Sequence, residues 1–139
     1  MQRAERKEQR ATTRKLVSEG FFAFEDLEVY QLAVDLVAQA YRLTNKFPDA
    51  ERFGLISQVR RAATSVTLNI AEGRGRGTDK DFARFLYQAR GSLLEVVSAF
   101  HIAERLSFVT REQTQPIFIA ANQLNSKLTA FIRKLGEDQ

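Results

Sequence analysis

The sequence of 139 residues lacks cysteine and contains one histidine, His101. Without cysteine the chain forms no disulfide and no thiolate metal site, which is typical of proteins from a reducing compartment. A single histidine cannot build a histidine metal cluster, and the Glu-x-x-His pairs that hold di-iron centres in helical bundles do not occur. The sequence therefore predicts a non-enzymatic protein with no catalytic residue, no bound metal and no cofactor.

Long apolar runs are absent as well. None approaches the roughly 18–20 residues that a membrane helix needs, and residues 1–20 carry too many charges for a secretory signal. Apolar residues nevertheless make up 44% of the chain and charged residues 27%, which is typical of a folded domain rather than a disordered one. We therefore expect one globular, cytoplasmic domain that does not bind membranes.

Proline is rare, with only Pro48 and Pro116. Apolar residues recur at spacings of three and four, and no segment alternates with a period of two for long, which indicates helices. The pattern predicts helices over about residues 27–46, 52–72, 79–106 and 111–135. Four long helices with short connections predict an all-α, antiparallel up-down four-helix bundle over residues 21–139, preceded by a basic, mobile or helical arm over residues 1–20.

Particular residues mark the expected ends of these helices. Asp26 is the N-cap expected for the first helix, and Thr78 or Asp79 is the N-cap expected for the third. Gly73 and Gly136 are expected to terminate the second and fourth helices, because glycine accepts the left-handed backbone that often follows a helix.

The start of the fourth helix has two solutions. Pro116 favours a start near Gln115, or a kink in the first turns. Thr110 followed by Gln113 would instead form a capping box and begin the helix earlier.

The first helix carries two apolar stripes. One is Tyr30, Val34, Val37 and Tyr41, and the other is Val29, Leu32, Leu36, Leu43 and Phe47. Together they form an apolar arc wider than a simple surface helix needs. We therefore expect this helix to pack both inside the bundle and against another subunit.

The charges are unevenly distributed along the chain. The net charge of +4 divides into +3 for residues 1–20, −4 for residues 21–51, +5 for residues 52–90 and 0 for residues 91–139. Positive charge concentrated in the arm and the middle of the chain suits a polyanionic partner. Ordinary solubilising surface charge explains the same distribution, and the sequence leaves both interpretations open.

The stretch NIAEGRGRG, residues 69–77, joins the second and third helices. It matches neither a Walker loop nor a dinucleotide fingerprint, because Gly73, Gly75 and Gly77 have the wrong spacing and no strand precedes them. Flexible glycines would leave Arg74 and Arg76 pointing outward beside a helix N-terminus, where they can contact phosphates. A solvated turn without a ligand is the alternative. The basic residues expected to contact nucleic acid are Arg60, Arg74, Arg76, Lys80 and Arg84.

A row of polar residues borders the apolar face of the second helix. At 100° per residue its members fall within an arc of about 80°; they are Gln58, Arg61, Ser65, Asn69 and Glu72. A polar row beside a core must be solvated, paired or used for binding. One interpretation is a hydrogen-bonded network that fixes helix register or a subunit contact. The other is a binding groove, for example one that takes a small molecule.

The third helix has a matching feature. Gly91 lies in its middle, where glycine costs about 1 kcal/mol relative to alanine and usually admits the close approach of a backbone or a ligand. Antiparallel pairing would bring Arg61 to the level of Glu95, as a candidate ion pair. We therefore assign Gly91 and Glu95 to the same expected network or interface.

Three segments resemble a known family: FEDLEVYQLAVDL, FPDAERFGLISQVRRAATSVTLNIAEGRGRG and FARFLYQARGSLLEV. With their spacing they are similar to the four-helix-bundle family of 23S ribosomal RNA intervening-sequence proteins, over about residues 24–135. The resemblance implies a bacterial protomer that assembles as a homopentamer with a central channel, with RNA or DNA binding as the suggested role. Thr67 departs from the family, in which proline is common at this position, and so does the long arm.

The resemblance extends to residues without an assigned role in the family: Gln58, Arg60, Arg61, Ser65, Asn69, Glu72, Gly73, Arg84, Phe85, Gly91, Ser92 and Glu95. A structurally similar family, the accessory variability determinant of diversity-generating retroelements, forms basic pentamers that bind a reverse transcriptase and nucleic acid. The preferred hypothesis is an oligomer whose basic surface binds RNA or DNA. The alternative is a protein-binding scaffold, or an accessory subunit of an enzyme such as a reverse transcriptase, that uses exposed apolar residues such as Leu68.

Overall fold

The computed structural model describes residues 21–137, and the arm expected at residues 1–20 lies outside them. Within this range the chain forms four long helices and no strand, which confirms the predicted all-helical class. The helices are α2 (Glu28–Thr44), α3 (Leu55–Arg74), α4 (Asp79–Arg105) and α5 (Arg111–Glu137). Two short 3-10 helices precede α2 and α3, namely η1 (Ala23–Asp26) and η2 (Asp49–Glu51).

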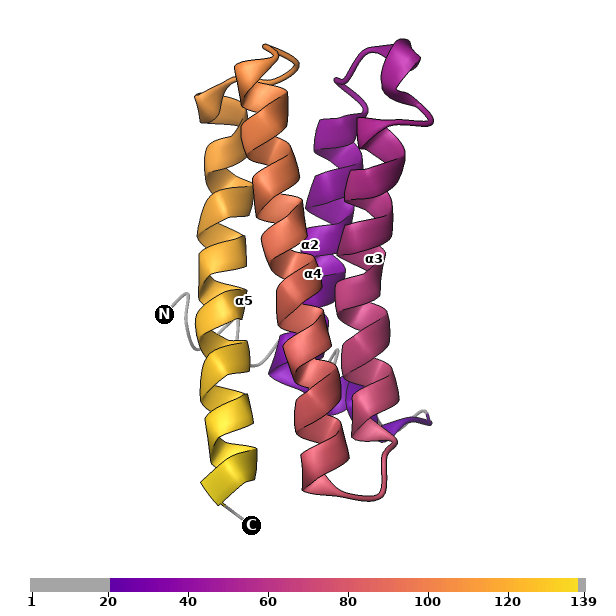
Figure 1. The fold of residues 1–139 in the computed structure, drawn as a ribbon, viewed down its shortest axis with the longest axis vertical. Helices are drawn as coiled ribbons and strands as arrows, with labels where there is room; N and C mark the ends of the chain where they lie inside the picture. The colour runs from indigo at the N-terminus through magenta and orange to yellow at the C-terminus, as the bar shows by residue number, and fades with distance from the viewer. Residues whose placement is uncertain (1–20, 138–139) are drawn as a thin grey trace, which may run out of the picture.

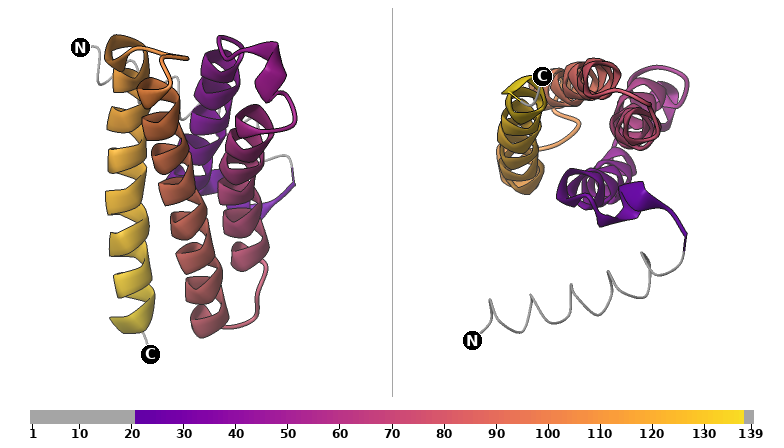
Figure 2. Two further views of the ribbon diagram at one scale, coloured as in Figure 1. Left: turned by 45° about the horizontal axis from the view of Figure 1, so that its top comes forward. Right: turned by 90° about the horizontal axis from the view of Figure 1, so that it is seen from below.

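The four helices run alternately up and down the bundle (Figure 1). Seen along the bundle axis, they follow one another around a ring in chain order (Figure 2). Each helix therefore packs against its two neighbours in the ring, and α3 makes its most extensive contacts with α4. The turns α2–α3 and α4–α5 lie at one end of the bundle, and the α3–α4 turn lies at the other end, near the C-terminus of α5.

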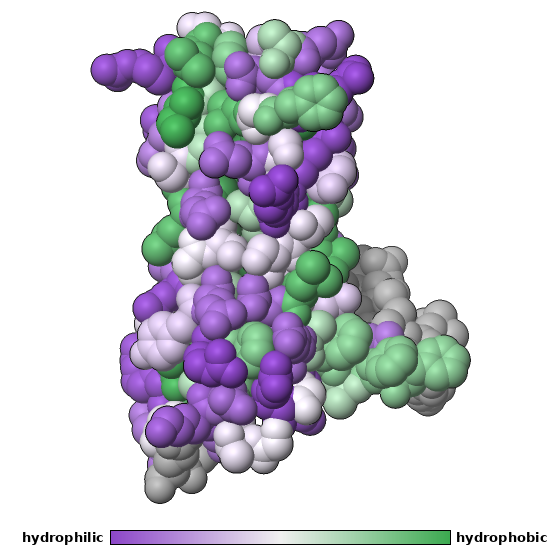
Figure 3. Space-filling model, turned by 45° about the vertical axis from the view of Figure 1, so that its right-hand side comes forward, coloured by the Kyte–Doolittle hydropathy of each residue, from purple (hydrophilic) through white to green (hydrophobic). Residues whose placement is uncertain are grey.

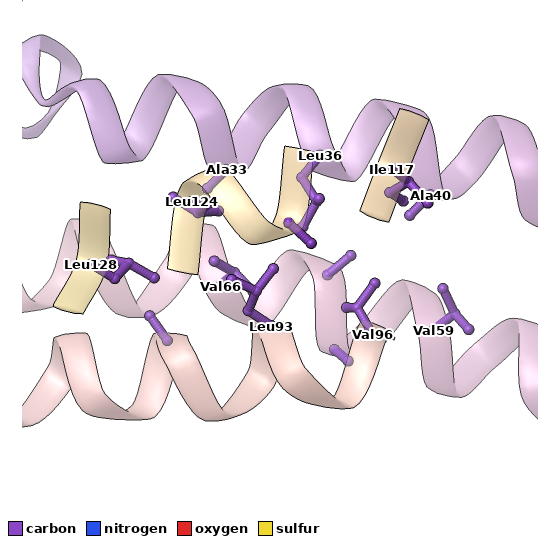
Figure 4. Close-up of a cluster of buried hydrophobic side chains, with 14 of the residues drawn as sticks. Ala33, Leu36, Ala40, Val59, Val66, Leu93, Val96, Ile117, Leu124 and Leu128 are labelled. Atoms are coloured by element: carbon purple, nitrogen blue, oxygen red, sulfur yellow. The ribbon is translucent and has the colours of Figure 1, made fainter. Parts of the chain in front are cut away.

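The core forms where the apolar stripes of all four helices meet, as Figure 4 shows for Leu36, Val66, Leu93 and Leu124. Each of these side chains is at most 1% exposed. In α4 the buried positions recur every three or four residues and include Phe82, Leu86, Ala89, Leu93, Val96, Phe100 and Ala103. The spacing of three and four in the sequence thus follows directly from one face of each helix being turned to the core.

The helix starts depend on local hydrogen bonds, two of which the sequence predicts. Thr78 caps α4, because its hydroxyl accepts a hydrogen bond from the backbone N–H of Asp81 at 3.1 Å. Thr110 and Gln113 form the reciprocal capping box that starts α5 before the proline, so Pro116 lies inside the helix. This confirms the earlier of the two predicted starts.

The predicted N-cap of the first helix is wrong. Asp26 belongs to η1, and Leu27 occupies the N-cap position of α2 without any side-chain hydrogen bond to the helix. Because Asp26 is the last residue of this 3-10 helix, it cannot be the N-cap of α2. A similar turn at η2 delays α3, which begins at Leu55 rather than near Arg52.

The predicted glycine terminators are also wrong. α5 continues through Gly136 to Glu137, and α3 continues through Gly73 to Arg74, with Gly75 as its C-cap. No glycine in the described residues has a positive φ, so left-handed backbone is not what these positions require. Gly73 is buried, and a Cβ atom built on it would lie 2.7 Å from Cβ of Phe85. Glycine at this position therefore allows the end of α3 to approach α4.

We predict that Gly73→Ala destabilises the protein by about 1–2 kcal/mol, because overpacking against α4 outweighs the gain in helix propensity. The matched control is Gly77→Ala, since nothing lies within 4 Å of a Cβ atom at Gly77. The free energy of unfolding of both variants is measured in urea at one protein concentration. Equal stability of the two variants would contradict the role of Gly73.

A carboxylate near the α4–α5 turn joins these two helices. Glu104, whose side chain is 15% exposed, accepts a hydrogen bond from the hydroxyl of buried Thr114 and lies 3.0 Å from the guanidinium of Arg111. The hydrogen bond from Thr114 lowers the pKa of Glu104 most, and Arg111 lowers it further, against the opposing effect of burial. The ionised carboxylate is therefore the form that stabilises this end of the bundle.

We predict that Glu104→Gln destabilises the protein at neutral pH by about 1–2 kcal/mol, at the low end of the contribution of hydrogen bonds to a charged group, because the amide oxygen of glutamine still accepts a hydrogen bond. Because the pKa is lower in the folded state, the stabilisation is present above the ordinary glutamate pKa and is lost as the pH falls through the folded-state value. Urea unfolding at neutral and acidic pH should show the difference from wild type shrinking as the pH falls. Glu95→Gln, at an exposed position, serves as the control. A difference that does not depend on pH would refute this explanation.

Candidate nucleic-acid interface

The turn between α3 and α4 is short and held by backbone hydrogen bonds. The N–H of Gly75 donates to the carbonyl of Glu72 at 3.1 Å, and the N–H of Arg76 donates to that of Gly73 at 3.0 Å. After one more glycine, Thr78 caps α4. The turn therefore reverses the chain directly, and its arginines stay close to the first residues of α4.

Two arginines converge on one aromatic ring at this turn. The guanidiniums of Arg76 and Arg84 lie over the ring of Phe85, at 4.6 and 4.7 Å from its centroid, so their central carbons are no more than about 9.3 Å apart. Arg76 also pairs with Glu72 at 2.9 Å, and Arg84 pairs with Asp81 at 3.4 Å. The ring and the carboxylates thus hold two positive charges at the same turn.

The expectation that both turn arginines point freely into solvent is wrong for Arg76, because of these contacts. Arg74 and Lys80 match it better. Both are exposed, and neither side chain makes a hydrogen bond or an ion pair with the part of the chain that the structure describes. The turn thus combines two anchored cations with two that reach into solvent.

Arg60 does not join this group. It precedes Arg74 by fourteen residues, which corresponds to about 21 Å along the helix axis. Its Nε donates to Oγ1 of Thr44 at 2.9 Å, its Nη2 donates to Oδ1 of Asn45 at 3.0 Å, and its guanidinium lies over the ring of Tyr41. Arg60 therefore ties the end of α2 to α3, and the structure gives it contacts that do not involve the other four predicted cations.

Part of the predicted polar row forms a hydrogen-bonded network between α3 and α4. Nδ2 of Asn69 donates to Oγ of Ser65 at 3.0 Å and to the carbonyl of Ser65 at 2.9 Å. The hydroxyl of Ser92 on α4 donates to Oγ of Ser65 at 3.0 Å. All three side chains are half-buried. The network fixes the register of α3 against α4, with Ser65 opposite Ser92.

The remaining members of the row do not join the network. Gln58, Arg61 and Glu95 are exposed, and within residues 21–137 no hydrogen bond or ion pair joins Arg61 to Glu95. The expected pair between them is therefore wrong for the single protomer. Glu72 turns instead to Arg76. A Cβ atom built on Gly91 would have no atom within 4 Å beyond its own helix, so no described group of the same protomer occupies the space that the absent side chain leaves.

Comparison with known proteins identifies the family. The family model for 23S rRNA-intervening sequence proteins matches residues 25–130. The chain belongs to this family. A crystal structure of a protein of unknown function from the S23 ribosomal protein family of Bacteroides thetaiotaomicron has a TM-score of 0.67 and 22% sequence identity. The match covers 75% of this chain and 97% of that one, and it supports the fold alone. No curated protein matches the sequence.

Two aromatic residues near the α3–α4 turn have roles that the sequence does not predict. Phe85 belongs to the residues shared with the family, but nothing in the helical pattern shows that two guanidiniums lie over its ring. Tyr87 is 53% exposed and lies away from the buried stripe of α4, where a large aromatic residue is a signal in itself. The helix period alone would have placed Tyr87 on the surface.

The described part of the family member offers little for other site types. Residues 21–137 contain no group of three or more His, Asp or Glu side chains arranged to hold a metal ion. Among the helices in this range, none combines the length and the hydropathy that a membrane crossing requires.

Proposed function

We propose that this protein is a non-enzymatic oligomer that binds the phosphate backbone of RNA or DNA. The site is the cationic end, defined as Arg74, Arg76, Lys80 and Arg84 around the α3–α4 turn. The observation that carries the proposal is the placement of Arg76 and Arg84 over the single ring of Phe85. Phosphate contacts from arginine and lysine supply most of the affinity of non-specific nucleic-acid binding.

The carboxylates near these arginines do not block such binding. The side chains of Arg76 and Glu72 are 40% and 57% exposed, and those of Arg84 and Asp81 are 55% and 47% exposed. Exposed ion pairs contribute only about 0–1 kcal/mol. A phosphate can therefore displace a carboxylate at small cost, and a guanidinium can bind phosphate oxygens through two parallel hydrogen bonds.

The contact with Phe85 favours binding in a second way. A long arginine side chain loses rotamer freedom when it binds a ligand, which opposes association. Arg76 and Arg84 are already restrained by the ring and by their carboxylates. Less conformational entropy is therefore lost when a phosphate arrives than at two unrestrained arginines.

Self-association through exposed positions of α3 and α4 is the second part of the proposal. These positions are Leu68 on α3 and Gly91, Leu94 and Ile102 on α4. The three apolar side chains are 65%, 52% and 48% exposed. A glycine inside a helix costs about 1 kcal/mol, and Gly91 has no neighbour in its own protomer that needs the space. The close approach of a second copy of the chain would use both features.

An oligomer would also strengthen attraction to polyanions. Residues 21–137 contribute +2 to the chain's net charge of +4, so a single bundle is only weakly positive. A homopentamer, the assembly implied by the family resemblance, would carry about +20 and repeat the cationic end five times.

We predict that Leu94→Asp shifts the protein from an oligomer to a monomer, because a buried unpaired carboxylate at an interface is strongly unfavourable. Gly91→Leu should act in the same direction by filling the space. Mass is measured by light scattering after size-exclusion chromatography. Ile119→Asp on α5, at a site 61% exposed, is the matched control and should leave the mass unchanged. A wild-type protein that is monomeric at micromolar concentration would refute self-association.

We predict that the protein binds RNA or DNA at about 50 mM salt and that the affinity falls steeply as salt rises. Double substitution of Arg74→Ala and Lys80→Ala should lower the slope of log K against log salt by about 2, one for each lost phosphate contact. Arg52→Ala, at an exposed position at the other end of the bundle, should leave the slope unchanged. Fluorescence anisotropy with labelled oligonucleotides measures both quantities. Absence of binding at this salt concentration would rule out the proposed function.

A protein-binding scaffold is the second candidate function. Exposed aromatic residues favour it: Phe53 on the α2–α3 connection is 92% exposed, and Phe21 and Phe22 are 86% and 58% exposed. Figure 3 shows hydrophobic side chains, in pale green, projecting from the body of the bundle at the lower right of the view. Failure of the salt titration, together with an intact oligomer, would favour this function, with an accessory role for a nucleic-acid enzyme as one form of it.

A further inference from the structure

A groove runs between the first turns of α4 and the last turns of α5, and Lys80 and Arg84 of the cationic end line it. Its volume is about 520 Å³, and its lining includes Lys80, Arg84 and Tyr87 from α4 with Ile132 and Gly136 from α5. Polar groups and apolar groups thus share one open hollow at the end of the bundle where the proposed phosphate contacts lie. The α4–α5 groove is therefore a place where a partly apolar, partly anionic ligand would fit.

The aromatic wall of this groove is accessible and held in place. Tyr87 is 53% exposed, and the guanidinium of Arg90 lies 5.0 Å from its ring centroid. Nη1 of Arg90 also donates a hydrogen bond to Oγ1 of Thr129 on α5 at 3.0 Å. Arg90 is thus held by α5, and it covers and restrains one face of the Tyr87 ring, which leaves the other face for a ligand. A restrained, exposed aromatic ring is what a nucleobase needs for stacking.

The spacing along α4 relates this ring to the cations. Lys80, Arg84 and Tyr87 are separated by four and three residues, so they lie about one turn apart on neighbouring parts of the helix surface. A base stacked on Tyr87 would have its own backbone within reach of Arg84 and Lys80. The one carboxylate in the lining, Asp81, pairs with Arg84 at 3.4 Å, and both side chains are about half exposed, so this weak pair can open.

We propose that the α4–α5 groove binds single-stranded nucleic acid, with one base stacked on Tyr87 and the adjoining phosphates on Arg84 and Lys80. This inference rests on the proposed function and names the class of nucleic acid that the same cationic end takes. A duplex buries the faces of its bases in its own stack and offers the protein only its backbone and groove edges. A single strand offers both a free base face and phosphates, which matches a ring flanked by cations.

The test uses the full chain and fluorescein-labelled oligonucleotides of one length, as a single-stranded oligo-dT, a single-stranded oligo-U and a duplex. Anisotropy titrations at about 50 mM salt and at several higher concentrations give the affinities and their salt slopes. We expect the single strands to bind more tightly than the duplex at equal length. Tyr87→Ala should weaken single-strand binding by about tenfold, within the range found for the loss of one base–aromatic stack.

Matched variants separate stacking from other effects. Tyr87→Ala should leave the salt slope and duplex binding unchanged, because no phosphate contact is lost, whereas Arg84→Ala should lower the slope by about 1 for both kinds of ligand. Tyr87→Phe retains a stacking surface and should bind like wild type. Phe53→Ala removes an even more exposed aromatic residue at the other end of the bundle and should also bind like wild type.

Two results would overturn the inference while leaving the proposed function intact. One is equal binding of single strands and duplex with no effect of Tyr87→Ala. The other is a loss of binding by Tyr87→Ala that accompanies dissociation of the oligomer, measured by light scattering, because the ring would then act in assembly. No binding of any oligonucleotide at 50 mM salt would instead remove the proposed function itself, and the inference with it.

Discussion

The packing of α3 against α4 at the turn that joins them depends on the absence of a side chain at Gly73. Because Gly73 has no Cβ atom, its backbone can lie close to Cβ of Phe85. Farther from the turn, the hydrogen bond between Ser65 and Ser92 also joins the two helices. This close pairing fixes where Phe85 lies relative to the turn. The guanidiniums of Arg76 and Arg84 lie over this ring. The candidate site therefore depends on the close approach of Gly73 to Phe85, which a larger residue at position 73 would prevent.

The position of each basic residue in the bundle, rather than the number of basic residues, decides whether it is available to a ligand. Two of the five basic residues singled out in the sequence, Arg76 and Arg84, are restrained at the turn, while Arg60 is occupied with Thr44 and Asn45 at the far end. A cation whose donors are used inside a protomer contributes to the register of two helices. An exposed cation that lies over a buried ring, as Arg76 and Arg84 lie over Phe85, remains able to exchange its weak carboxylate partner for a phosphate.

The residues that the sequence predicts well are those whose role is local. Thr78 caps α4 and the Thr110–Gln113 pair starts α5, because such caps depend on backbone groups two or three residues away. The sequence predicts Gly73 poorly, because this glycine allows two helices to pack closely and does not terminate its own helix. The pair expected between Arg61 and Glu95 failed for a similar reason. Helix period places both on one level, but the rotamers and the exact separation of the helices decide whether they meet.

The sequence by itself determined that the described chain is helical, that its helices pair antiparallel through short turns, and which face of α3, α4 and α5 is buried, because these follow from a period of three to four and from the chain's own connectivity. For α2 it offered two apolar stripes, and the packing buries the small residues Ala33 and Ala40 between them. The tertiary structure alone decided which polar and cationic side chains meet. Ser92 hydrogen-bonds to Ser65, 27 residues earlier in the chain, and Arg90 hydrogen-bonds to Thr129, 39 residues later. Such contacts depend on the distance and rotation between packed helices, which no single helix encodes.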